Sequence, residues 1–160
     1  MNEQIMKVLV RTSLLSAMLL VSVVTSTKGQ SIEYRIRANI PFDFNVANTK
    51  LPAGKYSVER TMQSSGDSIL SVSDSNGNSR LSSAAIPVED WHTSAKARLV
   101  FHRYGDQYFL FQVWPPSATT GRQFMKSRSE RELMKNVAKN RQNSERDELV
   151  QIVTIVGSVE

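Results

Sequence analysis

The chain has 160 residues and no cysteine. This absence excludes a disulfide scaffold, a cysteine-ligated zinc site and a cysteine nucleophile. Histidine is scarce, because His92 and His102 are the only two, and most catalytic triads and zinc sites need histidine. The sequence also lacks the Gly-x-Ser-x-Gly elbow, a phosphate-binding loop and the glycine pattern of dinucleotide-binding domains. We therefore expect no catalytic residue, no metal site and no cofactor.

The chain also lacks a hydrophobic run long enough to span a membrane. Its longest uncharged run covers residues 12–27 and is 16 residues long, whereas a spanning helix needs roughly 20 apolar residues. Two basic residues precede this run and small residues follow it, which is typical of a secretory signal peptide. We expect residues 1–29 to be a signal peptide cleaved after Ser26 or Gly29. The alternative is an uncleaved N-terminal anchor.

Cleavage predicts an exported protein, periplasmic or secreted, with no remaining transmembrane span. The 20 basic and 15 acidic residues give a net charge of +5. Removal of residues 1–29 takes three basic residues and one acidic residue with it and lowers the net charge to +3. Nucleic-acid-binding domains concentrate much more basic charge on one surface. We therefore expect no nucleic-acid partner.

The rest of the chain shows the two-residue hydrophobic alternation of half-buried strands. The alternation is clearest over residues 40–46 and 56–62. Strands are also expected over residues 69–73 and 80–88, and Asn76-Gly77 between them predicts a type I′ hairpin, which requires two positive φ angles.

Two later strands are expected at the centre of the sheet. Residues 97–104 and 107–114 are joined through Gly105-Asp106, and both are apolar on each face. Such strands are typically covered on both sides. The final strand is expected over about residues 149–156, where β-branched residues dominate, and it is expected to be buried.

One helix is expected before that last strand, over about residues 128–141. Ser129 and Glu132 have the spacing of a capping box, and an apolar stripe begins at Leu133. The predicted fold is therefore mainly β: a single antiparallel β-barrel or β-sandwich of about seven to eight strands in one domain over residues 30–160. The pattern leaves barrel and sandwich open.

Three segments carry a resemblance to a known family. They are IPFDF from Ile40, LPAGKYSV from Leu51 and LVFHRYGD from Leu99. The chain resembles a family of small exported bacterial proteins that are rich in β-structure and have no assigned function. The resemblance implies export and a β-rich domain, and it supplies no catalytic residues. The strand order with a late helix is also similar to lipocalin-like barrels, although the Gly-x-Trp signature of those proteins is absent.

The aromatic residues are the main candidates for ligand binding. Seven of them could line a cavity for a small apolar ligand: Phe42, Phe44, Trp91, Phe101, Tyr108, Phe111 and Trp114. The alternative is that they fill the core of a small barrel or sandwich. Trp91 and Trp114 are expected at strand ends, where the mouth of a cavity would open.

Two other groups of residues have a chemical interpretation. Arg128, Arg131, Lys135 and Lys139 follow one side of the expected helix and could contact an anionic surface. Alternatively, these four basic residues simply form the solvent-exposed face of the helix. His102 and Asp106 flank a predicted tight turn and could form an acid–base pair, although a simple hairpin is the more economical explanation of this segment.

These observations predict an exported, non-enzymatic β-domain that acts as an envelope or secreted interaction module, with an unknown partner. A lipocalin-like carrier of a small apolar ligand is the first alternative. An enzyme that uses His102 and Asp106 is the second.

Overall fold

The computed structural model describes residues 31–62, 68–140 and 150–159. The strands in chain order are β1 (Ser31–Ile40), β2 (Phe44–Val46), β3 (Thr49–Leu51), β4 (Gly54–Met62), β5 (Ser68–Asp74), β6 (Ser79–Glu89), β7 (Ala97–Tyr104), β8 (Gln107–Trp114), β9 (Thr120–Phe124) and β10 (Gln151–Val159). Helix α2 (Arg128–Asn140) lies between β9 and β10. The mainly β fold with a helix before the last strand is confirmed. The expected signal peptide over residues 1–29 lies outside the described residues.

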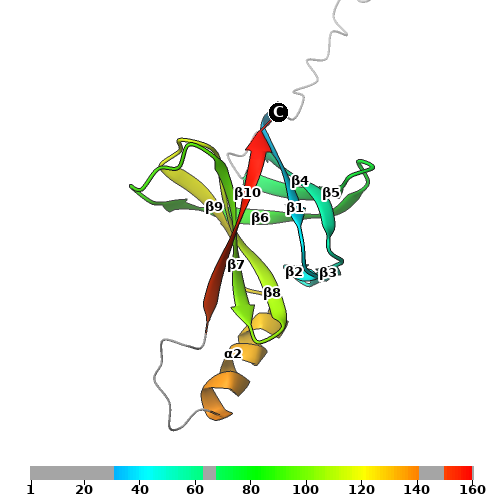
Figure 1. Cartoon of the computed structure of the whole chain (residues 1–160), viewed down its shortest axis with the longest axis vertical. Helices are drawn as coiled ribbons and strands as arrows, with labels where there is room; N and C mark the ends of the chain where they lie inside the picture. The colour runs from blue at the N-terminus through cyan, green and yellow to red at the C-terminus, as the bar shows by residue number, and fades with distance from the viewer. Residues whose placement is uncertain (1–30, 63–67, 141–149, 160) are drawn as a thin grey trace, which may run out of the picture.

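Eight of the strands close into an antiparallel barrel, so the choice between barrel and sandwich is settled (Figure 1). Around the ring the order is β8-β7-β10-β1-β4-β5-β6-β9, and β9 returns to β8. Strands β2 and β3 form an additional hairpin. Strand β2 pairs with β8 at residues 108 and 109, and β9 pairs with β8 at residues 112 and 113. One edge of β8 is therefore shared by two segments.

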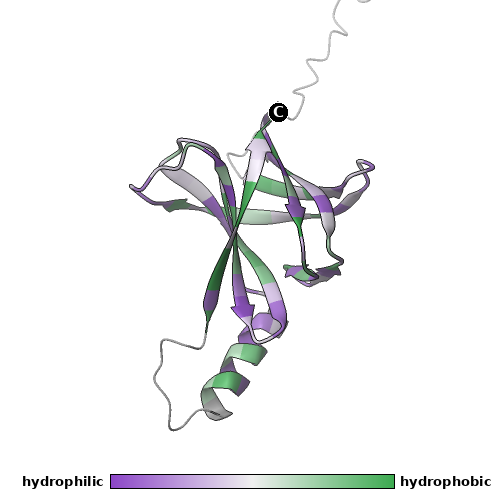
Figure 2. Cartoon of the chain, in the orientation of Figure 1, coloured by the Kyte–Doolittle hydropathy of each residue, from purple (hydrophilic) through white to green (hydrophobic). Residues whose placement is uncertain are grey.

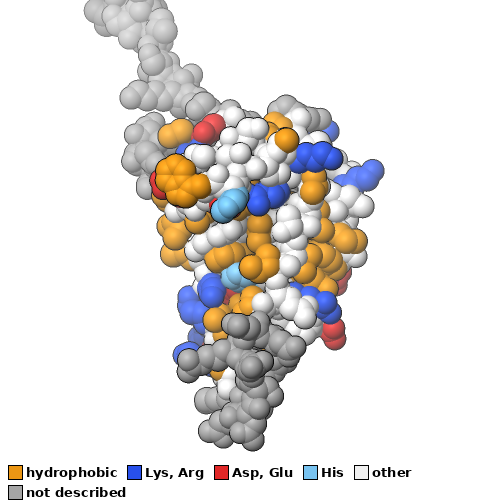
Figure 3. Space-filling model, turned by 60° about the vertical axis from the view of Figure 1, so that its left-hand side comes forward, with side chains coloured by type: hydrophobic (Ala, Val, Ile, Leu, Met, Phe, Trp, Pro, Cys, Tyr) orange, Lys and Arg blue, Asp and Glu red, His pale blue; other side chains and the backbone are white. Residues whose placement is uncertain are grey.

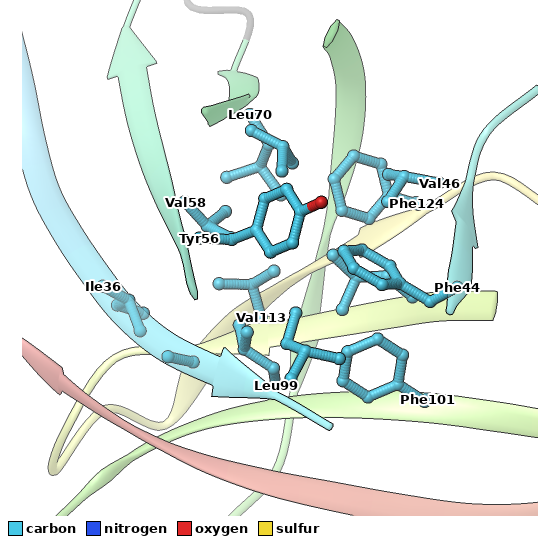
Figure 4. Close-up of a cluster of buried hydrophobic side chains, with 14 of the residues drawn as sticks. Ile36, Phe44, Val46, Tyr56, Val58, Leu70, Leu99, Phe101, Val113 and Phe124 are labelled. Atoms are coloured by element: carbon cyan, nitrogen blue, oxygen red, sulfur yellow. The ribbon is translucent and has the colours of Figure 1, made fainter. Parts of the chain in front are cut away.

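Alternating side chains fill the inside of the barrel. Hydrophobic and hydrophilic residues alternate along the strands in Figure 2, as expected where one face of a sheet is buried. Phe44, Phe101 and Phe124 are among the largest fully buried side chains. Figure 4 shows them pointing inward together with aliphatic residues of β1, β4, β5, β7 and β8. The interior is a packed core in this region.

Strands β7 and β8 are buried on both faces, as predicted. Leu99 and Phe101 of β7 face the core, whereas Val100 and His102 face outward and are buried as well. Helix α2 lies near the hairpin that joins the two strands (Figure 1), and its Glu130 contacts His102. The helix therefore covers part of the outer face.

The strand expected over residues 40–46 is wrong as a single element. Strand β1 ends at Ile40, and β2 begins only at Phe44. Proline lacks the N–H that a ladder requires, so Pro41 interrupts the pairing. Asp43 then accepts a hydrogen bond from the Ala53 N–H at 3.0 Å, which ties the break to the following turn.

The hairpin between β5 and β6 is present, but its turn is not the expected type I′ turn. Gly77 has a φ of 80°, and Asn76 is not among the residues with positive φ. The Gly77 N–H bonds to the carbonyl of Asp74 at 3.0 Å. The Asp74 carboxylate also accepts hydrogen bonds from the backbone N–H groups of Asn76 and Asn78, at 2.9 and 3.0 Å. The hydrogen bonds to Asp74 therefore hold a loop that is longer than a two-residue turn. Gly77 is the residue of this loop that has a positive φ angle.

Helix α2 occupies the predicted range, but its cap lies two residues earlier than expected. The Oγ of Ser127 accepts a hydrogen bond from the Glu130 N–H at 3.1 Å, which is the geometry of an N-cap. The N-cap residue is therefore Ser127 rather than Ser129.

The last strand begins and ends later than expected and is not buried. Strand β10 covers Gln151–Val159, and none of its described side chains falls in the buried class. Ile152 and Val156 are 69% and 56% exposed. The β-branched composition therefore predicted a strand correctly, but the prediction that this strand is buried is wrong.

Candidate functional site

Two arginines meet at one end of the barrel. Arg60 lies on β4 and Arg122 lies on β9, and both contact Ser68 at the start of β5. We call the set Tyr34, Arg60, Ser68 and Arg122 the arginine end. Arg60 continues the inward phase of Tyr56 and Val58 along β4, and it is only 8% exposed. A buried arginine needs partners that compensate its desolvation.

Arg60 makes two kinds of contact. Its Nε and Nη2 donate to the Oγ of Ser68 at 3.1 and 3.0 Å. Its Nη1 pairs with the carboxylate of Glu33, which is partly exposed. The exposed carboxylate of Glu33 therefore neutralises the charge of Arg60. The Nε and Nη2 donors of Arg60 share a single acceptor, the Ser68 hydroxyl.

Arg122 of β9 approaches the same hydroxyl. Its Nε donates to the Oγ of Ser68 at 3.3 Å, and its Nη1 donates to the carbonyl of Gly121 at 2.8 Å. Burial lowers the pKa of Arg122, and the positive charge of Arg60 lowers it further. A guanidinium nevertheless stays protonated in proteins, so two cations face one neutral acceptor.

Ser68 cannot satisfy all of these donors. A hydroxyl oxygen has two lone pairs, whereas three N–H groups from Arg60 and Arg122 point at it. At least one strong donor therefore remains for an additional acceptor. Hydrogen bonds from guanidinium groups to an anion are stronger than those to a neutral hydroxyl.

Tyr34 adds an unused donor. Within the described part of the chain, its hydroxyl is buried and has no hydrogen-bond partner. Burial raises the pKa of Tyr34 to about 12, against the opposing effect of Arg60 and Arg122. The phenol is therefore protonated at neutral pH and can donate. A buried hydroxyl without a partner is uncommon in folded proteins.

A groove of about 690 Å³ opens over Tyr34, Arg60 and Arg122. It is lined by Glu33, Tyr34, Arg60, Pro115, Pro116, Ser117, Ala118, Thr119, Thr120, Arg122 and Val159. The loop between β8 and β9 forms one wall, and Ser117 in that loop has a positive φ of 56°. The groove thus gives solvent access to the arginine pair, and Tyr34 also lines it, although its hydroxyl oxygen is itself buried.

A second buried polar cluster holds the helix. Glu130 Oε1 lies 3.0 Å from His102 Nδ1 and accepts a hydrogen bond from the Tyr104 hydroxyl at 3.1 Å. Burial raises the pKa of Tyr104, and the neighbouring Glu130 carboxylate raises it further. The His102 ring stacks on Phe111 with 3.7 Å between the ring centres. Both contacts meet at Glu130 Oε1, so the cluster joins α2 to β7.

This cluster changes the interpretation of His102. The sequence suggested Asp106 as its carboxylate partner, but Asp106 is exposed in the turn between β7 and β8. The partner found in the structure is Glu130, which lies 28 residues further along the chain. His92, the other histidine, is exposed and contacts Asp90 through its Nδ1 at 3.1 Å.

The seven aromatic candidates do not share one cavity. Phe44 and Phe101 are fully buried in the core and contact each other with 5.6 Å between ring centres. Phe42 stacks on Tyr108 at 3.8 Å beside that core. Phe111 lies against His102 on the outer face.

The two tryptophans lie in opposite environments. Trp91 is 82% exposed in the segment between β6 and β7. Trp114 ends β8 as predicted and is buried, with the Arg98 guanidinium 5.4 Å from its ring centre. Hydrophobic side chains also reach the surface among polar ones on the face in Figure 3.

The basic helix residues are partly engaged. Arg128 pairs with Glu132 at 2.7 Å, and Arg131 donates to the carbonyl of Lys126 at 2.6 Å. Lys135 is exposed, whereas the side chain of Lys139 lies outside what the structure describes. Their arrangement resembles an ordinary solvated helix face.

The arginine end was not anticipated from the sequence, although one signal was present. Arg60 lies in phase with Tyr56 and Val58, so period-two counting places it inside. Arg122 lies in a short polar strand that no hydrophobic pattern marks. Arg60 and Arg122 lie close together only because distant strands pair, and hydrophobic periodicity within one segment does not predict that pairing.

No protein-family model, curated protein or solved structure matches this chain. The resemblance to a family of small exported proteins therefore remains a prediction. Across residues 31–62, 68–140 and 150–159, no helix has the length and apolar character needed to cross a membrane. Over the same residues, no group of three histidine, aspartate or glutamate side chains could hold a metal ion.

Proposed function

We propose that this protein is an exported, non-enzymatic binding module that holds a small oxyanion at the arginine end of its barrel. The observation that carries the proposal is the surplus of buried donors: three guanidinium N–H groups share the Oγ of Ser68, and the Tyr34 hydroxyl has no partner in the described residues. A carboxylate or phosphate that enters the groove would accept hydrogen bonds from the guanidinium groups, and Tyr34 lines the same groove.

The electrostatics favour an anion of low charge. Arg60 and Arg122 bring two positive charges, and Glu33 returns one negative charge at the rim. An anion in the groove would complete this balance without leaving a buried charge unpaired. The groove volume of about 690 Å³ falls in the range of small-molecule sites, which is roughly 300–1,000 Å³.

The apolar-carrier alternative receives less support. Its candidate residues Phe44 and Phe101 pack against each other in the core, and Trp91 lies on the surface. A dye-displacement titration with an apolar fluorophore tests this alternative. We expect no uptake, and saturable uptake that anions do not reverse would favour the carrier over the anion site.

Export is supported by the N-terminal pattern of a basic flank, an uncharged run over residues 12–27 and small residues. The test is the N-terminal sequence of the protein purified from its native host. We expect it to begin at Thr27 or Gln30. Retention of Met1 would contradict export by a cleaved signal.

Isothermal titration calorimetry at low ionic strength tests anion binding. The probes are inorganic phosphate and acetate, which share oxyanion chemistry and separate a phosphate ligand from a carboxylate ligand. We expect at least one of them to bind, and Arg122→Gln to weaken that binding at least about tenfold, because a charge-assisted hydrogen bond is lost. Tyr34→Phe should weaken it as well.

The matched control is Arg128→Gln, since Arg128 is exposed on α2 and pairs only locally with Glu132. This variant should bind the anion as the unmodified protein does. Equal losses in Arg122→Gln and Arg128→Gln would indicate a general charge effect and contradict the site. Absence of binding for both probes would contradict it as well.

A further inference from the structure

Strand β10 differs from the other barrel strands in how it is paired. On one side, β7 pairs with it continuously from Gln151 to Gly157. On the other side, β1 pairs with it only through Ser158 and Val159. Within the described residues, the edge over residues 151–156 that faces away from β7 therefore has no partner strand, whereas Gly157 already packs against β1. Backbone N–H and C=O groups along such an edge are available to another strand.

This edge lacks the features that normally prevent strand addition. Exposed edges in monomeric proteins usually carry a lysine, a proline or a bulge. Residues 151–159 contain no charged residue and no proline, and residues 152–156 are five consecutive β-branched residues. Ile152 and Val156 expose apolar side chains on the outer face. An unprotected apolar edge of this kind is expected to be covered in the native assembly.

We propose that the partner is a second copy of this chain, which pairs its own β10 antiparallel to the first. The segment Ile152-Val153-Thr154-Ile155-Val156 is nearly symmetric about Thr154. With a two-fold axis at Thr154, Ile152 lies opposite Val156 of the second copy, and Val153 lies opposite Ile155 of the second copy. Each apolar residue meets an apolar residue, and the two threonines face each other, which is a favourable cross-strand pair.

The geometry closes after two copies. A contact in which the same surface meets itself across a two-fold axis gives a dimer and does not propagate into a fibre. The paired strands would extend the order β7-β10 of each barrel into one sheet through both molecules. No like charges meet along the contact, because residues 151–159 carry none. A partner of different sequence would not use this self-complementary pattern.

Analytical ultracentrifugation over a wide range of protein concentration measures the assembly. We expect a concentration-dependent dimer. Thr154→Lys places two ammonium groups opposite each other at the axis and should raise the dimer dissociation constant at least about tenfold. Thr154 is exposed on the outer face of β10, so the monomer should keep its circular dichroism spectrum.

The matched control is Ser79→Lys, since Ser79 is exposed at the start of β6, far from β10 in the ring order. This variant should dimerise normally. A monomer at every concentration, or equal weakening by both lysine variants, would overturn the proposal.

Cross-linking provides a second, independent test because the natural chain has no cysteine. Residues directly opposite in antiparallel strands have Cα atoms close enough for a disulfide. Thr154→Cys should therefore form a disulfide-linked dimer on mild oxidation, whereas Ser79→Cys should not. Equal cross-linking of the two variants would contradict the two-fold axis at Thr154. This outcome is independent of anion binding at the arginine end.

Discussion

Glycine is needed at position 121 because a neighbouring side chain leaves no room for a Cβ atom, and not because the backbone has a positive φ angle. A Cβ placed on Gly121 would lie 2.6 Å from Cδ2 of the Trp114 indole. The two residues lie opposite each other where β9 meets β8, next to the pair Val113 and Arg122. The glycine therefore lets a large aromatic ring lie flat over the strand junction that closes the barrel.

We predict that Gly121→Ala destabilises the protein by about 1–3 kcal/mol, because the ring must shift out of a well-packed position. Urea unfolding measures the effect. Gly54→Ala is the control, since a Cβ there would meet Tyr56 at an ordinary 3.6 Å. Equal destabilisation of both variants would contradict a specific contact with Trp114, because the change in backbone entropy favours the folded state in both.

The Tyr34 hydroxyl predicts how stability depends on alkaline pH. Its pKa is about 12 in the folded protein, above the ordinary value of 10.0. The unfolded state therefore releases this proton first, and the stability contributed by Tyr34 is complete below pH 10.0 and lost as the pH rises to about 12. Tyr104 has a raised pKa as well and contributes in the same direction.

We predict that the free energy of unfolding falls through this alkaline window and that Tyr34→Phe makes the fall less steep. Urea unfolding at a series of pH values measures both. Near neutral pH, Tyr34→Phe should leave stability unchanged or slightly raised, since it removes a buried hydroxyl without a partner. A loss of more than about 1 kcal/mol at neutral pH would indicate a hydrogen bond that the Phe variant has lost.

Helix α2 depends on one buried carboxylate for its position. Glu130 occupies the first turn, where its negative charge complements the helix dipole, and it meets His102 and Tyr104 of β7. Leu133 and Val137, which the sequence indicated as the packing stripe, are only half-buried. Polar contacts at the start of the helix therefore position it more than the apolar stripe does.

We predict that Glu130→Ala destabilises the protein by about 1–3 kcal/mol, because two buried polar groups lose their partner. Glu132→Ala is the matched control: Glu132 is exposed, pairs only with Arg128, and should change stability by less than about 0.5 kcal/mol. Circular dichroism during urea unfolding measures both. A similar loss in the two variants would contradict a specific contribution of the contacts with His102 and Tyr104, because alanine favours the helix at both positions.

The elements that sequence reasoning found and missed differ in a physical way. Strands β7 and β8 were recognised as central because both faces are apolar. Strand β1 was missed although Tyr34, Ile36 and Ala38 alternate with polar residues, so the signal was available. Strand β9 carries almost no apolar signal and is held by its neighbours on both sides. The arginine end joins β1, β4, β5 and β9, and such distant pairing cannot be deduced from local periodicity.

Over the described residues, the barrel closes through two short strand pairings, or seams. Strands β8 and β9 pair through residues 112 and 113, and β1 and β10 pair through Ile36–Val159 and Arg37–Ser158. By contrast, β1 and β4 pair along almost their entire length. Barrel closure removes sheet edges only where the seam is complete, so the short seam between β1 and β10 leaves β10 open to a second chain. The anion groove touches this same seam at Val159.

Gly157 controls how closely that seam can approach. A Cβ on Gly157 would lie 2.7 Å from Cγ2 of Ile36 and 2.9 Å from the carbonyl oxygen of Arg37. The second contact is with backbone, which cannot move without disturbing the pairing between β1 and β4. We predict that Gly157→Ala forces the two strands apart and lowers stability by about 1–3 kcal/mol.

Hydrogen exchange can locate this effect within the barrel. Amides at the seam, in Ile36, Arg37 and Val159, should lose protection in Gly157→Ala, whereas those in β7 and β8 should keep it, because local opening follows the weakest pairing. Ser158→Ala is the control, since Ser158 is exposed and the change adds no atom to the seam. Uniform loss of protection through all strands would show that the barrel opens as one unit and that the seam is not its weak point.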